Sequence, residues 1–160
     1  MSPIFLRPAE QADRPALADL WVAAWTPVLP QIDFASRRAW FLDHWRGLEA
    51  GGAVAIVAET AAAPQGFMIF HPASGYIDQI AVASAAQGSG LAKLLLDWAK
   101  ARCPDGLSLK VNQDNPRAAR FYQREGFAIG GTGISAASGL ALWDMAWAKA
   151  DRDAGPATSS

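Results

Sequence analysis

The stretch from Tyr76 to Lys93, with the sequence YIDQIAVASAAQGSGLAK, constrains the fold more than any other part of the chain. It begins as a β-run over residues 76–83, crosses a loop of small residues and enters an amphipathic helix over residues 90–102. A glycine-rich turn between a strand and a helix gathers backbone N–H groups at the positive end of the helix dipole. The stretch therefore predicts an anion-binding site that needs no lysine.

The spacing of the glycines in this turn excludes two common phosphate-binding motifs. The P-loop pattern G-x-x-x-x-G-K-[ST] is absent, and a Rossmann turn would need a third glycine where Lys93 stands. Gly88 and Gly90 have no Cβ, so the amides from about Gly88 to Lys93 can converge on a diphosphate. Taken alone, the two glycines are also compatible with a tight turn that binds nothing.

The rest of the chain predicts one mixed α/β domain built mostly on a single sheet. β-runs are expected at 3–8, 53–59, 66–71, 76–83, 107–112, 127–129 and 141–147. Helices are expected at 9–26, 37–49, 90–102 and 116–125, with Asp13, Ser36 and Asn115 as candidate N-caps of the first, second and fourth. Residues 130–139 are expected to form a Gly/Ser-rich connection and residues 150–160 a frayed tail, so that the domain spans 1–149.

Composition narrows the classes of partner and ligand. The net charge is −1, from 14 basic and 15 acidic residues, and no segment concentrates Lys or Arg, so we expect no nucleic-acid partner. Cys103 is the single cysteine, and His44 and His71 lie far apart in sequence, which argues against a disulfide and a zinc site. No apolar run approaches about 18 residues and no leader is evident, so we expect a cytoplasmic protein with no membrane partner.

Two motifs follow one another at successive strand–helix junctions. The first is Gln87-x-x-Gly90-x-Ala92. The second is Leu109-x-Val111-Asn112-x-x-Asn115-x-x-Ala118-x-x-Phe121-Tyr122-x-x-x-Gly126-Phe127. In this order they resemble the pyrophosphate signature R/Q-x-x-G-x-G/A and the second motif of the GNAT superfamily of N-acetyltransferases. The resemblance covers residues 66–127, and the order of elements over the whole chain agrees with it.

The resemblance implies a fold and a co-substrate. The implied fold is that of acyl-CoA N-acyltransferases: a central mixed, mostly antiparallel sheet with splayed central strands, flanked by helices. The implied co-substrate is acetyl-CoA, with its pantetheine arm along the strand from Gln79 to Ala83 and its pyrophosphate on the glycine turn. The implied cofactor-binding residues are Ile80, Ala81, Val82, Gln87, Gly88, Ser89, Gly90, Leu91, Ala92, Lys93, Asn112, Asn115 and Tyr122. Arg117 and Arg124 are candidates for the adenosine phosphate, although exposed arginines on a helix are mostly only solvated.

The resemblance also implies that Tyr122 is the general acid of the reaction. A phenol is protonated at neutral pH, so Tyr122 can supply a proton to the departing CoA thiolate. The alternative is an aromatic residue that only packs beside Phe121. Cys103 stands at a helix end away from both motifs, and direct attack by the amine needs no such nucleophile.

Asp78 is the best candidate for the general base that deprotonates the acceptor amine. Strand alternation places Asp78 on the same side as Ile80 and Val82. The alternative is a structural hydrogen bond at the start of the strand. Some family members carry a glutamate in the following strand, where this chain has Lys110. Two reserves for the base on neighbouring strands are Glu59 and His71.

Aromatic residues gather in the N-terminal third of the chain, mostly at helical spacing that favours the core. Trp25 and Phe34 lie near the loop between the first two helices and are the candidates for contact with the acceptor. An aromatic wall suits an ammonium-bearing or apolar acceptor, and the absence of an acidic cluster disfavours a polyamine. The sequence thus predicts an N-acetyltransferase that acetylates a primary amine of an unidentified small molecule by direct attack. Alternatives are a protein or peptide N-acetyltransferase and a non-catalytic acyl-CoA-binding module; a homodimer is compatible, paired through a closing strand such as 141–147.

Overall fold

Seven strands form one mixed sheet in the computed structural model, which describes residues 3–61 and 63–148. The order across the sheet is β1-β2-β3-β4-β5-β7-β6. The strands are β1 (Phe5–Pro8), β2 (Val54–Glu59), β3 (Pro64–His71), β4 (Tyr76–Val82), β5 (Leu107–Asn112), β6 (Ala128–Ile134) and β7 (Ala141–Trp147). Neighbours are antiparallel except β4 and β5, which are parallel. The predicted mostly antiparallel mixed sheet is confirmed, while the tail expected at 150–160 lies outside the described residues.

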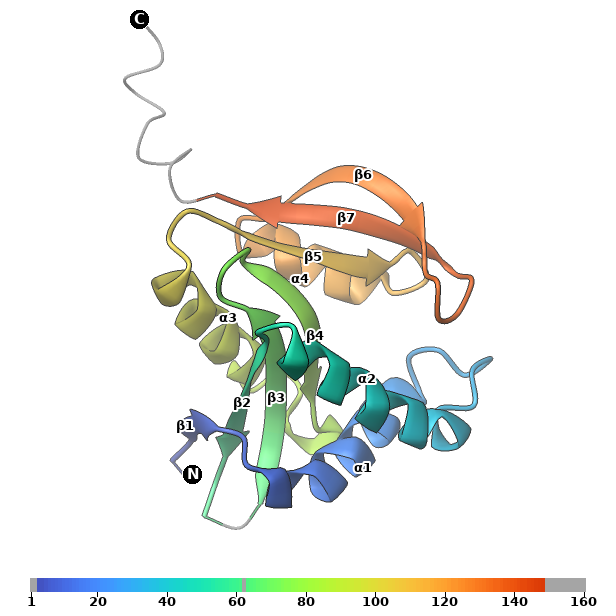
Figure 1. Cartoon of the computed structure of the whole chain (residues 1–160). Coiled ribbons are helices and arrows are strands. Elements are labelled where there is room, and N and C mark those ends of the chain that lie inside the picture. Colours follow the sequence, from blue (N-terminus) through green and yellow to red (C-terminus); the bar gives the residue numbers. More distant parts are fainter. Residues whose placement is uncertain (1–2, 62, 149–160) are drawn as a thin grey trace, which may run out of the picture.

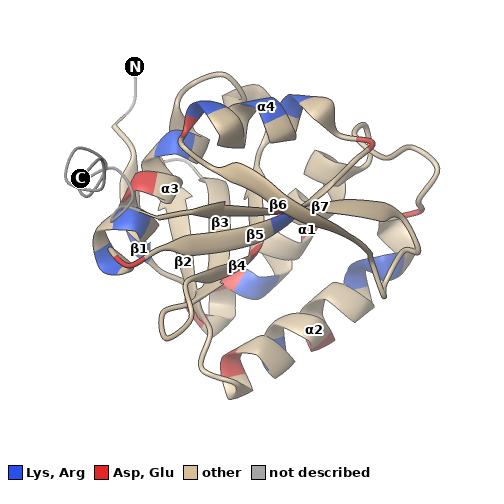
Figure 2. Cartoon of the chain, turned by 90° about the horizontal axis from the view of Figure 1, so that it is seen from above, with Lys and Arg blue, Asp and Glu red and all other residues tan. Residues whose placement is uncertain are grey.

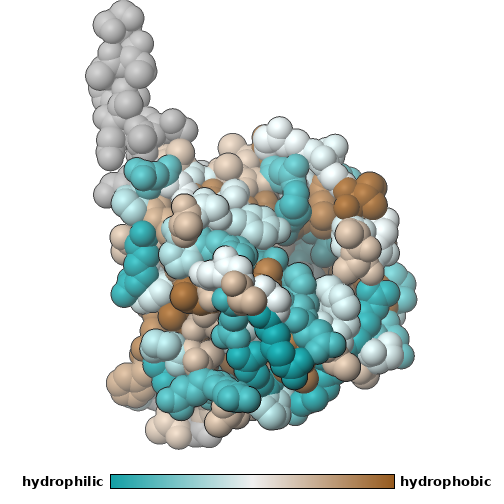
Figure 3. All heavy atoms as spheres, in the orientation of Figure 1, coloured by the Kyte–Doolittle hydropathy of each residue, from teal (hydrophilic) through white to brown (hydrophobic). Residues whose placement is uncertain are grey.

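Helices cover both faces of this sheet (Figure 1). The helices are α1 (Arg14–Trp25), α2 (Arg38–Ala50), α3 (Leu91–Arg102) and α4 (Pro116–Arg124), and single 3-10 turns are η1 (Gln11–Asp13), η2 (Ala35–Arg37) and η3 (Ser84–Ala86). In β3, Phe67 and Ile69 belong to the core beneath α1 and α2, whereas Met68 and Phe70 belong to the core beneath α3 and α4. Because β3 is buried on both faces, its sequence is continuously apolar rather than alternating. On the face drawn in Figure 3, strongly hydrophobic residues lie only in small separate groups.

Local sequence signals account for some helix ends and not for others. Asn115 caps α4 as predicted, because its Oδ1 accepts a hydrogen bond from the Ala118 N–H at 3.3 Å. Ser36 does not cap α2, since it lies inside η2 and its own N–H donates to Asp33. In α3, Leu94 is 40% exposed, whereas Leu91, Leu95 and Leu96 are buried.

β6 is longer than the sequence predicts, because residues 130–134 continue the strand instead of forming a loop. Gly131 pairs with Asp144, and the pairing runs on to Ile134 opposite Ala141 after a register shift between Ile129 and Gly131. Glycine gives no β-propensity signal, so only the hydrogen bonds offered by β7 extend this strand. With β5 on one side and β6 on the other, β7 has no free edge, so a homodimer paired through residues 141–147 would have to displace one of these neighbours.

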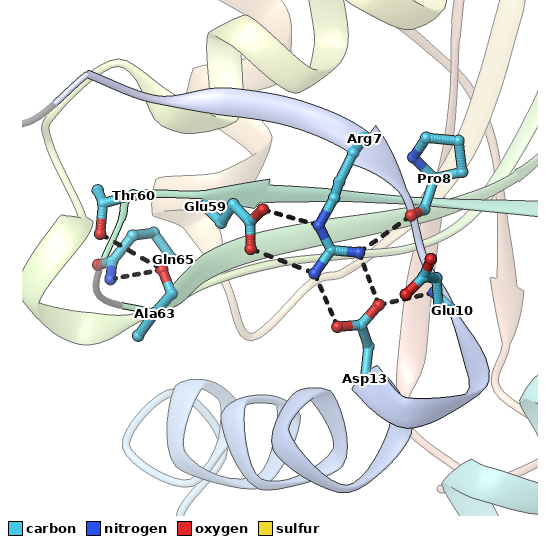
Figure 4. A network of polar contacts seen from close by, with 8 residues as sticks. All are labelled: Arg7, Pro8, Glu10, Asp13, Glu59, Thr60, Ala63 and Gln65. Atoms are coloured by element: carbon cyan, nitrogen blue, oxygen red, sulfur yellow. Dashed lines mark hydrogen bonds and ion pairs between the residues drawn. The ribbon is translucent and has the colours of Figure 1, made fainter.

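An arginine-centred cluster joins β1, the end of β2 and the start of α1 (Figure 4). The Arg7 guanidinium donates to Asp13 at 2.7 and 2.8 Å and to Glu59 at 2.7 Å. The hydrogen bond from Arg7 lowers the pKa of Asp13 below its usual range. Asp13 also accepts from the Glu10 N–H at 2.6 Å, so its carboxylate is engaged here rather than as the predicted cap of α1.

Two loops touch where β4 and β5 begin. Gly75 has φ +77°, and a Cβ at this position would lie 2.2 Å from the carbonyl oxygen of Gly106. The Ser108 N–H donates to the Gly75 carbonyl at 3.0 Å, which continues the contact into the first pair of residues of the two strands. Only glycine permits this approach, and the approach sets the starting point of both central strands.

We expect Gly75→Ala to lower the free energy of unfolding by at least about 2 kcal/mol, because it combines a left-handed backbone with a backbone clash. Gly139→Ala is the matched control: Gly139 has φ +75°, but nothing lies within 4 Å of the added Cβ. In the control, backbone strain should lower the free energy of unfolding by only about 1 kcal/mol. Urea unfolding of the three proteins measures both values, and equal losses would show that the contact between the loops contributes nothing.

Candidate active site

The central strands β4 and β5 form a fork. They are paired only at Tyr76 with Ser108 and at Ile77 with Leu109, and then diverge (Figure 1). Along residues 79–82, the backbone groups of β4 that face β5 therefore pair with no strand in the described part of the chain. Buried peptide groups need partners, so this edge can hydrogen-bond an extended ligand chain lying in the fork. The splayed central strands predicted from the family resemblance are confirmed.

A β-bulge at Asp78 redirects the side chains of β4. Ile69 pairs with Gln79 while its neighbour Phe70 pairs with Ile77, so Asp78 is the extra residue. A bulge turns successive side chains to one side, and here Asp78 contacts α2 while Gln79 contacts α1. Ile80 and Val82, by contrast, pack toward α3 and α4. The prediction that Asp78 shares the side of Ile80 and Val82 is therefore wrong, because the bulge breaks the alternation on which it rested.

The Asp78 carboxylate lies in a chain of side-chain hydrogen bonds. Its Oδ1 is 2.8 Å from His44 Nε2 and accepts a hydrogen bond from Gln79 Nε2 at 3.0 Å. Gln79 in turn accepts from the indole N–H of Trp21 at 3.2 Å. The Asp78 side chain is only 13% exposed, so these contacts fix the orientation of its carboxylate. Asp78 Oδ2 has no hydrogen bond with another described residue.

His44 is the site residue that sequence reasoning missed. It lies on α2, 34 residues before Asp78, and its ring stacks on Trp40 with the centroids 4.7 Å apart. In the sequence, His44 is one member of the apolar side of a helix, and no motif connects it with β4. Only the packing of α2 against the bulge brings the imidazole to the carboxylate.

The glycine turn forms a cradle of backbone amides at the start of α3. Gly88 and Gly90 have φ of +81° and +87°, and a Cβ on either would meet nothing within 4 Å. The first intrahelical N–H is that of Leu94, which bonds to the Gly90 carbonyl, so the amides of residues 91–93 have no partner inside the helix. The cradle therefore has open space and free donors for an anion, as the sequence predicts.

The side chains of Lys93 and Ser89 at the cradle are engaged by other protein groups, so anion binding there depends on backbone amides. Lys93 extends to Asp97 and Glu125, each at 3.1 Å, and these carboxylates raise its pKa. The Ser89 hydroxyl donates to the Ala86 carbonyl inside the turn. The Ser89 amide donates to the same carbonyl at 3.2 Å, so Ser89 stabilises the turn, and Lys93 contributes to the cradle through its amide rather than through its side chain.

A groove of about 320 Å³ runs from the cradle between α3 and α4. Arg117 and Arg124 of α4 line it, and Figure 2 shows the basic residues along this helix. Arg117 lies 3.5 Å from Gln87 Oε1, and Gln87 lies 3.5 Å from the Val82 carbonyl, both at the limit of hydrogen bonding. The two arginines therefore lie beside the amide cradle, where the family resemblance implies that the phosphates of the co-substrate bind.

Three neighbouring cavities share lining residues. The groove shares Asn115 and Tyr122 with a cavity of about 170 Å³ inside the fork. The fork cavity shares Trp25 and Asp78 with a third cavity of about 660 Å³, here called the aromatic pocket. The aromatic pocket is lined by Trp21, Trp25, Phe34, Trp40, His44 and Asp78, and residues 134–138 at the tip of the β6–β7 hairpin also line it. Asp78 thus faces the aromatic pocket, and Tyr122 faces the groove.

Tyr122 is a packed aromatic and a cavity residue at once. Its ring packs edge-on against Phe121 and Phe127, at centroid distances of 5.2 and 5.6 Å. Its hydroxyl makes no hydrogen bond with another described residue, and the side chain lines both the groove and the fork. Burial raises the pKa of Tyr122 well above its ordinary value, so the phenol keeps its proton at every physiological pH.

The other predicted residues divide between the site and the scaffold. Trp25 and Phe34 stack with centroids 6.2 Å apart in the wall of the aromatic pocket, and Asn112 lies where fork and pocket meet. Glu59 is engaged by Arg7, and His71 stacks on Tyr76. Neither reserve base lines any of the three cavities.

Residues 14–127 match the acetyltransferase (GNAT) family. A 68-residue segment is 32% identical to peptidyl-lysine N-acetyltransferase YjaB of Salmonella typhimurium, and it covers 42% of this chain and less than half, 45%, of that relative. The solution structure of apo-form YjaB from Escherichia coli superposes with a TM-score of 0.74 at 22% identity, over 91% of this chain and 97% of that chain. The paia N-acetyltransferase of Thermoplasma acidophilum, solved in complex with coenzyme A, superposes with a TM-score of 0.73 at 15% identity, over 91% and 99% of the two chains. At these identities the two solved structures establish the fold.

Two further findings concern residues 3–61 and 63–148. Within them, no helix is long and apolar enough to cross a membrane. The same residues contain no group of three or more His, Cys, Asp or Glu side chains that could hold a metal ion.

We expect Gly90→Asp to weaken acetyl-CoA binding at least tenfold, because its carboxylate would lie among the amides that the diphosphate needs. Gly139→Asp is the matched control, with a similar positive φ, the same new charge and a position away from the cradle. Calorimetric titration with acetyl-CoA measures both affinities. Near-normal affinity in Gly90→Asp would mean that the phosphates bind elsewhere.

Proposed function

The chain belongs to the acetyltransferase (GNAT) family, and we propose that it transfers the acetyl group of acetyl-CoA to the primary amine of a small molecule. The observation that carries this proposal is the row of three neighbouring cavities, from the groove at the amide cradle through the fork to the aromatic pocket, which share lining residues. A carboxylate, Asp78, faces the pocket end and a phenol, Tyr122, faces the cradle end. A base on the acceptor side and an acid on the thiol side are the two groups that amine acetylation requires.

The fork and the cradle fit acetyl-CoA, which supplies an activated acetyl thioester when bound. The amides of residues 88 and 90–93 would hold the diphosphate, and the unpaired backbone of residues 79–82 would pair with the pantetheine arm. Arg117 and Arg124, which line the groove beside the cradle, would meet the adenosine phosphate. The open space at Gly88 and Gly90 supports this assignment, since no side chain of the protein fills the cradle.

Asp78 is the general base of the proposed reaction. An amine is an ammonium ion at neutral pH and must lose a proton before it can attack a carbonyl carbon. The Asp78 carboxylate lines both the pocket and the fork, and its Oδ2 is left open while Oδ1 is bound by His44 and Gln79. In this proposal Asp78 takes the proton directly or through one water molecule, and His44 orients the carboxylate.

Tyr122 is the general acid of the same reaction. The sulfur that leaves must be protonated on the cradle side of the fork, and Tyr122 lines both of these cavities. Because the hydroxyl makes no hydrogen bond with a described residue and keeps its proton, it is free to donate into the fork. Direct attack by the neutral amine requires no covalent intermediate on the protein.

The dimensions of the aromatic pocket favour a small acceptor. Its volume of about 660 Å³ lies within the range of roughly 300–1,000 Å³ that is usual for small-molecule sites. Residues from α1, α2 and the β6–β7 hairpin line it. The second candidate is a lysine side chain of a peptide, which is favoured by the name of the Salmonella relative. A thiol-release assay with free amines and lysine peptides separates the two, and tight CoA binding without any turnover would instead support a non-catalytic module.

We expect Tyr122→Phe to lower kcat by roughly 10²-fold while the Kd for acetyl-CoA changes little, because phenylalanine keeps the packing but lacks the proton. The raised pKa of Tyr122 also means that its protonated form persists as pH rises, so kcat should show no loss from this group up to about pH 10. Stopped assays across pH, with calorimetry for the Kd, measure both. Unchanged turnover in Tyr122→Phe would remove this residue from the acid role.

We expect Asp78→Asn to lower kcat/KM at neutral pH, with a deficit that narrows as pH rises, because the acceptor amine then loses its proton without help. Asp144→Asn is the matched control, since Asp144 is a nearby carboxylate that is paired with Lys110. A pH profile of kcat/KM for the three proteins measures the effect. A deficit that is the same at every pH would assign Asp78 a structural role only.

A further inference from the structure

We infer that the acceptor amine carries a carboxylate, that an apolar segment separates the two groups, and that Arg37 binds the carboxylate. This inference rests on the proposed function and names the substrate class of the same pocket. It follows from the charges that line the aromatic pocket and from their order along α2 and the preceding turn η2.

One side of the η2–α2 segment presents a cation, an aromatic ring and the base assembly in sequence. Arg37, Trp40 and His44 stand at positions i, i+3 and i+7, so they lie on one side of the helix, and all three line the pocket. At about 1.5 Å per residue, Arg37 and His44 are roughly 10 Å apart along the axis. The Trp40 ring lies between them and stacks on His44. An elongated acceptor with its amine near Asp78 therefore extends over Trp40 toward Arg37.

Arg37 is a fixed cation without a carboxylate partner among residues 3–61 and 63–148. Its Nη1 donates to the Ala137 carbonyl at 3.0 Å, which holds the guanidinium against the tip of the β6–β7 hairpin. The adjacent Arg38, by contrast, is paired with Asp19 at 2.8 Å. Four of the five N–H donors of Arg37 remain for a ligand, in the planar geometry that matches a carboxylate.

The remaining groups of the pocket do not neutralise Arg37. Lys110 is paired with Asp144 at 2.7 Å. Burial, with a smaller contribution from Asp78 and Asp144, raises the pKa of Tyr76 to about 12, so this phenol is neutral. Asp78 is held by His44 at the other end of the pocket. A carboxylate is therefore the group that completes the pocket, whereas a second ammonium group would be repelled at Arg37.

The distance between the two ends selects among amines that carry a carboxylate. In an α-amino acid both groups are attached to one carbon atom, so it cannot lie at Asp78 and at Arg37 together. A dipeptide spans about 7 Å between its ends, and an ω-amino acid of similar length is equivalent. The apolar middle of such a molecule lies on Trp40 and the other rings of the pocket.

The test compares three probes with the same chain of carbon atoms: aminocaproate, hexylamine and hexamethylenediamine. Trp21, Trp25 and Trp40 line the pocket, so tryptophan fluorescence of the CoA-saturated full-length protein reports binding without any turnover. We expect aminocaproate to bind about tenfold more tightly than hexylamine, and the diamine to bind most weakly. The Arg37→Gln substitution should remove the preference for aminocaproate over hexylamine, because it weakens the binding of aminocaproate and leaves that of hexylamine unchanged. Arg37→Lys should keep part of the preference, and Arg38→Gln, the matched control, should keep all of it.

Three results would overturn the carboxylate site. The first is no detectable binding of aminocaproate, and the second is equal affinity for aminocaproate and hexylamine. The third is an equal loss of affinity for both probes in Arg37→Gln, which would make Arg37 only a support for the hairpin tip. Acetylation assays on the same probes keep the two proposals apart. Preferred acetylation of hexylamine would overturn the carboxylate site and leave the transferase standing. A carboxylate preference in binding, with no acetylation of any amine, would overturn the transfer reaction and support the site.

Discussion

The separation of two parallel strands after only two residue pairs is the constraint on which the rest of this structure depends. A continuous sheet would pair the backbone of residues 79–82 internally and leave no place for a ligand chain. The contact between Gly75 and Gly106 joins β4 and β5 at their starts, and the bulge at Asp78 marks the point from which they diverge. The fork therefore does two things with one distortion: it opens a backbone edge toward the cradle and turns a carboxylate toward the aromatic pocket.

The half of the site that binds the anion could be predicted from the sequence because its signals are local. Gly90 takes a positive φ at the start of α3, and Asn115 followed by Pro116 begins α4, each within a few residues of the motif that predicts it. The apolar alternation of β5 is equally local, and it places Leu109 and Val111 inside. To bring backbone amides together at a helix start, the chain needs only the correct turn, and the residues that favour a turn type lie within a short stretch of sequence.

The half of the site that handles the acceptor depends on tertiary packing and could be predicted only in part. Asp78 was found as a carboxylate on the cofactor strand, but its direction was wrong, since a bulge shifts alternation by one residue without a mark in the sequence. His44 reaches it from an element 34 residues away. Asp13, a predicted cap, is instead engaged by Arg7, since a charged partner from a neighbouring strand outcompetes a local backbone contact.

The shape of β6 affects how well the outer edge of the sheet can pair with a further strand. β6 is one of the two outer strands of the sheet, and outer strands have unpaired backbone N–H and C=O groups that can pair with a strand of another molecule. A register shift lies between Ile129 and Gly131, and Gly131 and Gly133 lack the side chains that would stack with a neighbour. At the opposite edge, β1 is only four residues long and ends in Pro8, which has no N–H to donate. Both borders of the sheet thus lack the long, regular run of donors and side chains that pairing with a further strand requires.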